Sequence, residues 1–353
     1  MSLLWFVVGL ILLIVGAELL VMGASRVASL FRIPPLIIGL TVVAFGTSSP
    51  EFAVSIEAAL NDQASISVGN VIGSNIFNVL FILGISALIV PLLVSKQLIR
   101  FDIPLMILLS ALVLFMAQDR VLGFTDGVIL LLGLFAYLFY LFRQSRNEAL
   151  QEDEPAGTER PHLLRDAGLI VVGLVCLVIG SDQLIDGAIK IAAYFGVSEL
   201  IIGLTIVAAG TSLPELVTSV VAAIHGKRDI AVGNVVGSNL FNIMGVLGVA
   251  SIISPGGIDV PESLLHFDLL VMLGVAVVCL PVFFTGGVIS RSEGAAFLIY
   301  YIAYSSYLVF DAMEHVLLNP FSNTMLYFFM PLTLLAIGFS VVQDSRFKAR
   351  HKR

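Results

Sequence analysis

Two short polar motifs contain the residues that could carry chemistry, and each motif occurs twice. The first reads GLTVVAFGTSSPE at 39–51 and GLTIVAAGTSLPE at 203–215, with ten of 13 positions identical. The second reads GNVIGSNIFN at 69–78 and GNVVGSNLFN at 233–242, with eight of ten positions identical. The two copies are 164 residues apart, and all four segments are otherwise apolar. Because polar groups are costly to bury without a partner, these segments indicate a functional site.

The side chains of these motifs offer oxygen as their ligand atom, from carboxylates, hydroxyls and amides. Neither motif contains His or Cys, which borderline metals such as zinc prefer. Hard cations prefer oxygen, and Ca²⁺ takes about 6–8 oxygen ligands. The carboxylates of Glu51 and Glu215 together balance one Ca²⁺ or two monovalent cations. The motifs therefore predict an all-oxygen cation site.

A proline in the first motif should break its helix beside the carboxylate. Pro50 lacks an N–H and its ring opposes the carbonyl four residues earlier, so a helix must break or kink near Gly46. Carbonyls near Ala44 then lose their helical partners, which in a membrane is tolerated only beside a cavity or a ligand. Thr47 and Glu51 are four residues apart and face one side. The second copy repeats the arrangement with Ala208, Gly210, Thr211, Pro214 and Glu215.

The second motif forms a polar stripe with a spacing of four residues. Asn70, Ser74 and Asn78 occupy one face of a helix, and the second copy matches them with Asn234, Ser238 and Asn242. Small polar residues also act as hydrogen-bonded contacts between membrane helices. We expect such contacts at Asn70, Asn75, Asn234 and Asn239. We expect cation ligation at Ser74, Asn78, Ser238 and Asn242, because the stripes would face the two glutamates.

The composition is that of an integral membrane protein. Apolar residues make up 58% of the 353, charged residues 12%, and the mean hydropathy is +1.04. A membrane span needs roughly 20 mostly apolar residues. The chain contains eleven such runs, at 3–25, 34–60, 66–93, 102–118, 123–142, 166–189, 198–224, 230–253, 267–285, 294–310 and 324–342.

The distribution of basic residues predicts how these spans are oriented. With the N-terminus outside, 16 of the 18 Lys and Arg residues fall in cytoplasmic segments, and only Arg120 and Lys190 fall outside. The sequence repeat begins at the first span and again at the sixth, so each unit contains five spans. Because five is odd, the second unit must enter the membrane inverted. Inverted repeats with a site at the midplane are typical of secondary transporters.

We therefore expect an all-α integral membrane protein in which two inverted five-helix repeats form a ten-helix core. The predicted divisions are the first half at 1–142, a short cytoplasmic linker at 143–165, and the second half at 166–310. An additional C-terminal transmembrane helix and a basic cytoplasmic tail would occupy 311–353. Asp102 and Asp268 lie near the start of a span, where the helix dipole favours acids.

The doubled motifs GTSxPE and GNxxGSNxFN resemble the repeats of the calcium/cation antiporter superfamily, in particular its prokaryotic sodium/calcium exchanger branch. The resemblance implies Na⁺/Ca²⁺ exchange by alternating access, with spans 1 and 6 sliding across a core of four motif helices. It also implies a set of cation ligands shared between the halves. These are Ala44, Thr47, Ser48, Glu51, Ser74 and Asn78 in the first half, and Ala208, Thr211, Ser212, Glu215, Ser238 and Asn242 in the second.

The chain departs from that family's pattern in ways that bear on the substrate. Position 242 is Asn, where the potassium-dependent branch has Asp, so we expect exchange that is independent of K⁺. The linker is too short for the regulatory calcium-binding domains of animal exchangers. The eleventh span is additional to the ten-helix core. Glu18 and Asp182 occupy matching positions in spans 1 and 6, either as cation stations on an access path or as interhelical contacts.

Three other functions fit less well. An H⁺/Ca²⁺ antiporter on the same scaffold is the nearest alternative, but it would not need the extra neutral oxygens that Na⁺ requires. A cation channel usually lines its pore with rings of groups in an oligomer. An intramembrane hydrolase would need an activating base, and the sequence shows none. We expect no enzyme activity, no cofactor, no nucleic acid and no obligate protein partner, and we expect the plasma (inner) membrane as the location.

Overall fold

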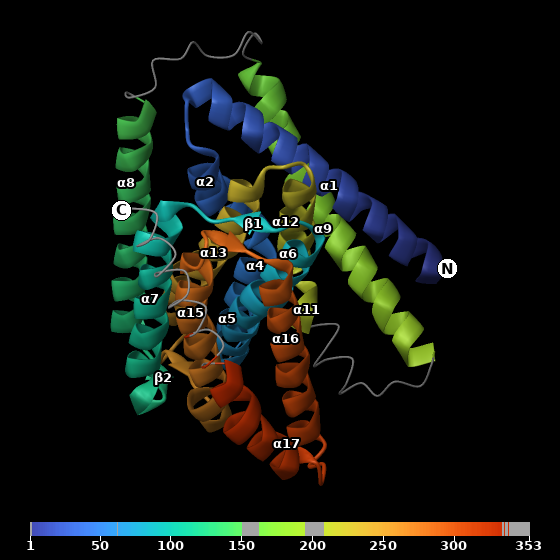
Figure 1. Cartoon of the computed structure of the whole chain (residues 1–353), viewed down its shortest axis with the longest axis vertical. Coiled ribbons are helices and arrows are strands. Elements are labelled where there is room, and N and C mark those ends of the chain that lie inside the picture. The colour runs from blue at the N-terminus through green and yellow to red at the C-terminus, as the bar shows by residue number, and fades with distance from the viewer. Residues whose placement is uncertain are drawn as a thin grey trace, which may run out of the picture.

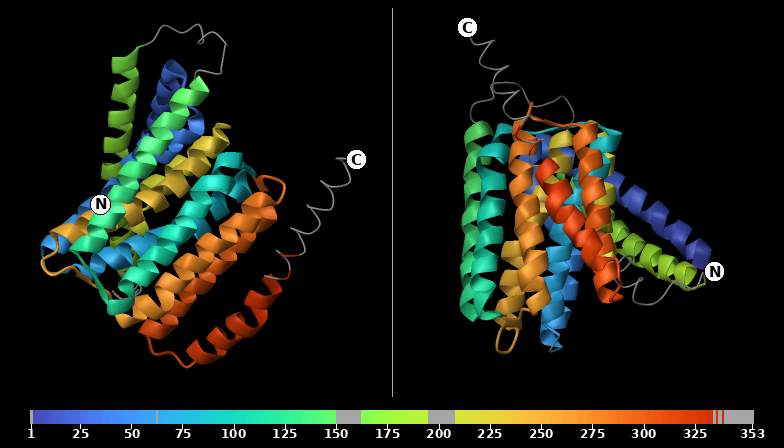
Figure 2. Two further views of the ribbon diagram at one scale, coloured as in Figure 1. Left: turned by 90° about the vertical axis from the view of Figure 1, so that its left-hand side faces the viewer. Right: turned by 60° about the horizontal axis from the view of Figure 1, so that its bottom comes forward.

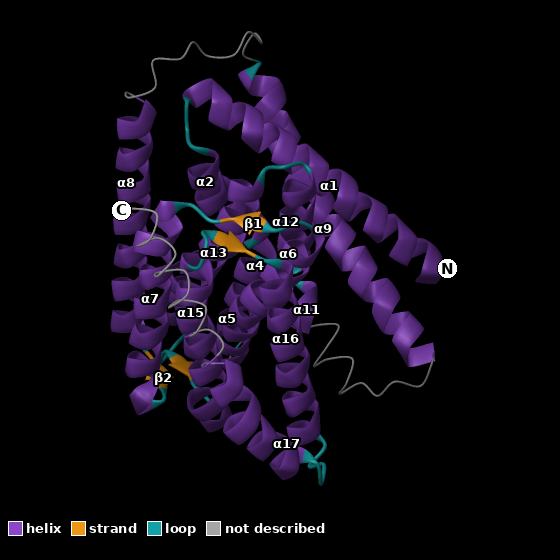
Figure 3. Ribbon diagram, in the orientation of Figure 1, coloured by secondary structure: helices purple, strands orange, loops and turns teal. Residues whose placement is uncertain are grey.

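A computed structural model describes residues 2–61, 63–149, 162–194, 208–333, 335 and 338. This part of the chain is almost entirely helical, apart from two small pairs of strands (Figure 3). Within it, eight helices are long and apolar enough to cross a membrane, and one further crossing is bent by 46° between Pro35–Thr47 and Ser49–Leu60. The protein is therefore an all-α, multi-pass membrane protein, as predicted.

The first half contains the following helices: α1 (Ser2–Phe31), α2 (Pro35–Ile38), η1 (Gly39–Val43), α3 (Ala44–Thr47), α4 (Ser49–Leu60), α5 (Ser65–Phe77), η2 (Asn78–Leu83), α6 (Gly84–Ile89), η3 (Leu98–Asp102), α7 (Ile103–Met116), η4 (Ala117–Asp119) and α8 (Phe124–Ala149). The second half contains α9 (Leu163–Tyr194), α11 (Ala208–Gly210), α12 (Leu213–Ile224), α13 (Arg228–Phe241), η6 (Asn242–Val246), α14 (Leu247–Ile253), η7 (Leu264–Asp268), α15 (Leu269–Phe284) and α16 (Arg291–Ala312). The helices α17 (Leu318–Thr324) and η8 (Met325–Phe329) follow.

Nine of the predicted spans correspond to described helices, with some differences at their ends. The helix of the fifth span continues to Ala149, seven residues beyond the predicted end at 142. The first part of the predicted seventh span, 198–207, lies outside the described residues, and its second part is α11 and α12. The predicted eleventh span, 324–342, lies only partly within the described residues.

The second motif of each half lies on a central helix. In an apolar stretch of 18 residues within 65–89, formed by α5, η2 and α6, 72% of the residues are buried, and in the corresponding stretch within 228–253, formed by α13, η6 and α14, 83% are buried. By contrast, 33% and 22% of the residues are buried in the corresponding stretches of α1 and α9. Figure 1 shows α5 and α13 in the middle of the molecule and α1 and α9 at one side. The polar stripes are thus placed in the interior, away from lipid.

The two halves are joined by strand pairs that each take one strand from either half. β1 (Leu92–Leu93) pairs antiparallel with β4 (Val288–Ile289), and β2 (Val121–Leu122) pairs antiparallel with β3 (Ile258–Asp259). Paired strands must lie at the same face of the membrane. The loops before α7 and α16 therefore share one face, and the loops after α7 and α14 share the other. This agrees with the alternation of loops that the eleven predicted spans require.

The helices α1 and α9 pack against each other in opposite directions, with glycines at the contact (Figure 2). A Cβ added to Gly9 would lie 2.7 Å from the carbonyl oxygen of Gly180, and one added to Gly16 would lie 2.8 Å from that of Gly173. Residues further along α1 thus contact residues nearer the start of α9. Since α1 and α9 are the matching first helices of the two units, their antiparallel packing supports the inverted relation of the repeats.

Proline sets the break in both motif helices. Pro50 and Pro214 lie in the first turn of α4 and α12, where a missing N–H costs nothing. Ser48 and Ser212 precede these helices with ψ near 8° and 10°, outside helical geometry. The first break was expected near Gly46 but falls two residues later, because the helix α3 continues to Thr47. Ser48 and Ser212 are therefore the residues at which the two motif helices break.

Candidate cation site

The two helix breaks meet at the centre of the protein and exchange hydrogen bonds. The hydroxyl of Ser48 donates to Oε1 of Glu215 at 2.9 Å, and the hydroxyl of Ser212 donates to Oε1 of Glu51 at 2.8 Å. These contacts are reciprocal, as a two-fold relation between the halves requires. Both glutamates are fully buried. The predicted pair of acids is thus assembled from both halves and shielded from lipid.

Each of these carboxylates keeps one oxygen without a partner. Oε2 of Glu51 and Oε2 of Glu215 are buried and accept no hydrogen bond from a described residue. The same holds for Oδ1 of Asn78, Oδ1 of Asn242 and the hydroxyl of Ser238. Buried polar atoms normally have partners, so five such oxygens in the motif residues call for an explanation. A hard cation is the ligand that an unpartnered, all-oxygen donor set fits.

The threonines of the motifs contact the asparagines of the opposite half. Thr47 donates to Oδ1 of Asn234 at 3.0 Å, and Thr211 donates to Oδ1 of Asn70 at 3.5 Å. The hydroxyl oxygens therefore keep lone pairs for a cation. Asn70 and Asn234 also donate to the backbone carbonyl of the glutamate in their own half, both at 3.3 Å, so they connect helices as predicted.

Two serines that the sequence analysis did not single out complete this arrangement. Asn70 donates to Ser55 and Asn234 donates to Ser219, both at 3.0 Å. Each serine is one helical turn after its glutamate, and the two are 164 residues apart. The repeat offset was the signal that could have identified them. Both serines accept hydrogen bonds from the asparagines, and no described contact joins them to the unpartnered carboxylate oxygens.

The remaining expected ligands differ in how they are engaged. Ser74 is 3.5 Å from Oε1 of Glu51 and lies at the site. The carbonyl of Ala44 accepts the N–H of Ser48 at 3.0 Å, so it is bonded rather than free. The hydroxyl of Thr47 lies 3.3 Å from this carbonyl and 3.0 Å from Oδ1 of Asn234, and its one proton serves either acceptor. Ala208 begins α11, directly after residues outside the described part of the chain. Ligation by the carbonyls of these two alanines remains a prediction.

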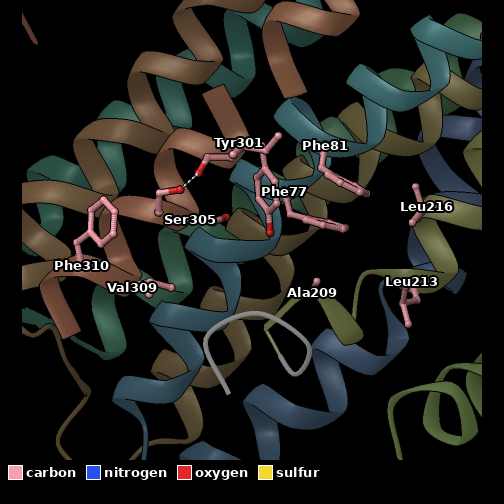
Figure 4. A pocket seen from close by; sticks show the side chains of 11 residues that line it. Phe77, Phe81, Ala209, Leu213, Leu216, Tyr301, Ser305, Val309 and Phe310 are labelled. Atoms are coloured by element: carbon pink, nitrogen blue, oxygen red, sulfur yellow. Dashed lines mark hydrogen bonds between the residues drawn. The ribbon is translucent and has the colours of Figure 1, made fainter. Parts of the chain in front are cut away.

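An apolar hollow lies nearby but differs in chemistry from the cation site. It has a volume of about 550 Å³ and lies between the central helix α5–η2, the helix α12 and the helix α16 (Figure 4). Phe77, Phe81, Leu213 and Tyr301 are among its lining residues. Hydrocarbon and aromatic carbon cannot replace the water around a cation. The buried oxygens of the motifs, and not this hollow, are therefore the candidate cation site.

Two further predictions concern acids outside the motifs. Asp102 and Asp268 were interpreted as helix N-terminal residues, and this was wrong: each ends a π-helical segment within a continuous helix and makes no capping bond. Instead they accept hydrogen bonds from Tyr137 at 3.0 Å and Tyr304 at 2.6 Å. No periodic pattern in the sequence pairs these tyrosines with the acids, because each tyrosine lies on a different helix, beyond an intervening loop.

The comparisons with known proteins agree with this geometry. A family model described as sodium/calcium exchanger protein matches residues 1–143 and 166–310. The chain belongs to the sodium/calcium exchanger family. This confirms the resemblance seen in the doubled motifs, and it places the protein among transporters that exchange cations such as Ca²⁺.

Individual relatives of the exchanger cover most of its length. The inner membrane protein YrbG of Escherichia coli is 40% identical over 72% of this chain and 80% of its own. The sodium/calcium exchanger MaX1 of Methanosarcina acetivorans is 32% identical over 84% of this chain and 95% of its own. A solved structure of the sodium-calcium exchanger NCX_Mj, with a TM-score of 0.74 and 33% identity, covers 86% of this chain and 98% of that one. The exchanger thus shares both sequence and fold with sodium/calcium exchangers.

Proposed function

We propose that this exchanger moves Ca²⁺ against Na⁺ by alternating access, with Ca²⁺ and Na⁺ competing for the site around Glu51 and Glu215. One observation carries the proposal: two fully buried carboxylates, one from each half, each with an unpartnered oxygen and each bonded to the serine of the other half. The relative MaX1 is named a sodium/calcium exchanger, which supports the same assignment.

The charge of the site explains why exchange would replace leakage. Two carboxylates in a medium of low dielectric constant repel each other and disfavour the ionised, empty state. One Ca²⁺ or two Na⁺ neutralises them, so a loaded site crosses the barrier at lower cost than an empty one. Neutral hydroxyl and amide oxygens of Thr47, Thr211 and the motif asparagines serve Na⁺ as well as Ca²⁺. This distinguishes the proposal from proton coupling, which needs only the acids.

Two further features belong to the proposal. Asn242 adds no third charge to the site, and we expect transport to be independent of K⁺ for that reason. The excess of basic residues at one side of the membrane supports an N-terminus outside and a C-terminus in the cytoplasm. The carried ions are the only ligands that the mechanism needs, so it requires neither a cofactor nor a catalytic step.

A transport assay tests the proposal directly. Vesicles that contain the purified protein are loaded with Na⁺ and diluted into Na⁺-free medium with a trace of radioactive Ca²⁺. We expect Ca²⁺ uptake that stops when the Na⁺ gradient is removed and that does not change when K⁺ is added. The variant Glu215→Gln should be inactive in the same vesicles. Uptake driven by a pH gradient without Na⁺ would instead establish H⁺/Ca²⁺ exchange and refute the proposal.

A further inference from the structure

Four asparagines form a hydrogen-bonded cluster across the interface of the two halves, in which Asn75 and Asn239 bond to each other and Asn78 and Asn242 each attach at one end. Asn78 donates to Oδ1 of Asn239 at 2.9 Å, and Asn242 donates to Oδ1 of Asn75 at 3.1 Å. Asn75 in turn donates to the backbone carbonyl of Asn239 at 3.4 Å, and Asn239 donates to the backbone carbonyl of Asn75 at 3.3 Å. All four side chains are at most 3% exposed. This asparagine cluster joins the helix α5–η2 to its counterpart α13–η6.

The backbone carbonyls of Asn75 and Asn239 determine how every amide in the asparagine cluster is turned. A carbonyl oxygen can only accept, so the atom of Asn239 that faces the carbonyl of Asn75 must be its Nδ2. Oδ1 of Asn239 then points to the other side, towards Asn78. Because that oxygen can only accept, Asn78 must present its own Nδ2 to it. Oδ1 of Asn78 is thereby turned away from Asn239, and it is the oxygen without a partner. The same reasoning, with the halves exchanged, applies to Asn75 and Asn242.

Methionines from two outer helices occupy the remaining side of the central amides. Nδ2 of Asn239 lies 3.5 Å from the sulfur of Met106, and Nδ2 of Asn75 lies 3.7 Å from the sulfur of Met272. A thioether is a weak acceptor and never a donor. If the amide of Asn239 were flipped, its oxygen would face both a carbonyl oxygen and a sulfur, and its NH₂ would face the NH₂ of Asn78. The flipped orientation is therefore excluded at both positions.

We propose that Asn75 and Asn239 are positioning residues that fix, crosswise between the halves, which atom Asn242 and Asn78 present to the transported cation. This inference rests on the proposed function, in which the cation binds among the unpartnered oxygens. An asparagine that is free to rotate can present either its oxygen or its NH₂, and the NH₂ repels a cation. The hydrogen bonds to Asn239 and Asn75 hold Asn78 and Asn242 in one of these two orientations. A merely structural contact between helices would not depend on which end of the amide faces inward.

The test uses the fact that aspartate, unlike asparagine, has two equivalent oxygens and needs no orientation. Asn239→Leu removes the acceptor for Asn78, and Asn75→Leu removes the acceptor for Asn242. We expect each variant to weaken Ca²⁺ binding by about tenfold to a hundredfold, the usual effect of losing a partner that orients a ligand. In vesicles this should raise the KM for Ca²⁺ more than it lowers kcat.

The rescue should follow the hydrogen-bonded pairs, which are Asn78 with Asn239 and Asn242 with Asn75. Adding Asn78→Asp to Asn239→Leu should restore Ca²⁺ affinity, whereas adding Asn242→Asp should not. In the Asn75→Leu variant, Asn242→Asp should restore Ca²⁺ affinity and Asn78→Asp should not. Both aspartates add the same charge to the same site, so each serves as the matched control for the other. If a leucine variant does not fold, the smaller alanine takes its place in the same cycle.

Ca²⁺ affinity is measured by titration calorimetry on purified full-length protein, after wild-type Ca²⁺ binding and Na⁺-driven uptake have been established. Absence of those wild-type activities refutes the proposed function itself. With an active wild type, rescue that follows the pairs supports the positioning role. Equal rescue by both aspartates, no rescue by either, or unchanged affinity in the leucine variants overturns it.

Discussion

Replacing one of the paired acids should have opposite effects on Ca²⁺ binding and on the stability of the ion-free protein. Glu51→Gln keeps the shape of the side chain and removes its charge, and the hydroxyl of Ser212 can accept from the new NH₂ at the position where it now donates. One amide oxygen is then still available to a cation. Loss of one partner from a buried charge contact costs about 3–5 kcal/mol, which raises the Kd for Ca²⁺ roughly 150- to 5,000-fold.

This change has a measurable consequence for thermal stability. At free Ca²⁺ of about 100 times the wild-type Kd, binding stabilises the folded protein by about 2.7 kcal/mol. With the weakened Kd, the same Ca²⁺ adds less than about 0.3 kcal/mol. Without ions the effect reverses, because a neutral amide costs less to bury beside Glu215 than a second carboxylate does. We expect the ion-free variant to be more stable than the ion-free wild type by about 1–3 kcal/mol.

Thermal unfolding in detergent, with and without Ca²⁺, measures both effects in one experiment. Glu57→Gln is the matched control, since Glu57 is an exposed acid of the same helix, α4. It should change neither the ion-free stability nor the shift with Ca²⁺. The reasoning would be refuted by a Glu51→Gln protein that keeps the full stabilisation by Ca²⁺. It would equally be refuted by an ion-free variant less stable than the wild type.

Three other predictions follow from separate features of the structure. Ser48→Ala removes a hydroxyl that donates to a buried carboxylate, and it should weaken Ca²⁺ binding by about tenfold to a hundredfold in calorimetry. Gly16→Ala places a Cβ 2.8 Å from a carbonyl oxygen of α9 and should slow transport and lower the melting temperature, whereas Gly168→Ala, where nothing lies within 4 Å, should do neither. Leu93 and Asp259 lie in strand pairs at opposite faces of the membrane. An impermeant thiol reagent should therefore label Leu93→Cys only from the cytoplasmic side and Asp259→Cys only from outside. Labelling of both variants from one side would contradict the topology.

The sequence contained enough information to predict the class of the protein and most of the polar residues that the structure places together at the two helix breaks. The composition made a membrane protein unavoidable, because runs of about 20 apolar residues have no other stable environment. The 164-residue offset identified the repeat, and the odd number of spans in each unit implied its inversion. Pro50 and Glu51 in one motif indicated a broken helix beside a carboxylate. All of these are local patterns, which a linear chain displays without folding.

The tertiary structure decided which atoms face each other, and this depends on contacts between residues far apart in the chain. The crosswise bonds of Ser48 to Glu215 and of Ser212 to Glu51 could not be read from either motif alone, since each motif also offered a partner in its own half. The same is true of Tyr137 with Asp102, where a local interpretation as a helix terminus was wrong.

The sequence by itself determined that the oxygens come in two matching sets. Only the packing of η2 against α13 determined how the amide of Asn78 is turned, and with it which oxygen is left without a partner. The physical reason is that an amide has no intrinsic preference between its two ends. Its orientation is fixed by the donors and acceptors around it, and at this position those groups belong to the other half of the chain.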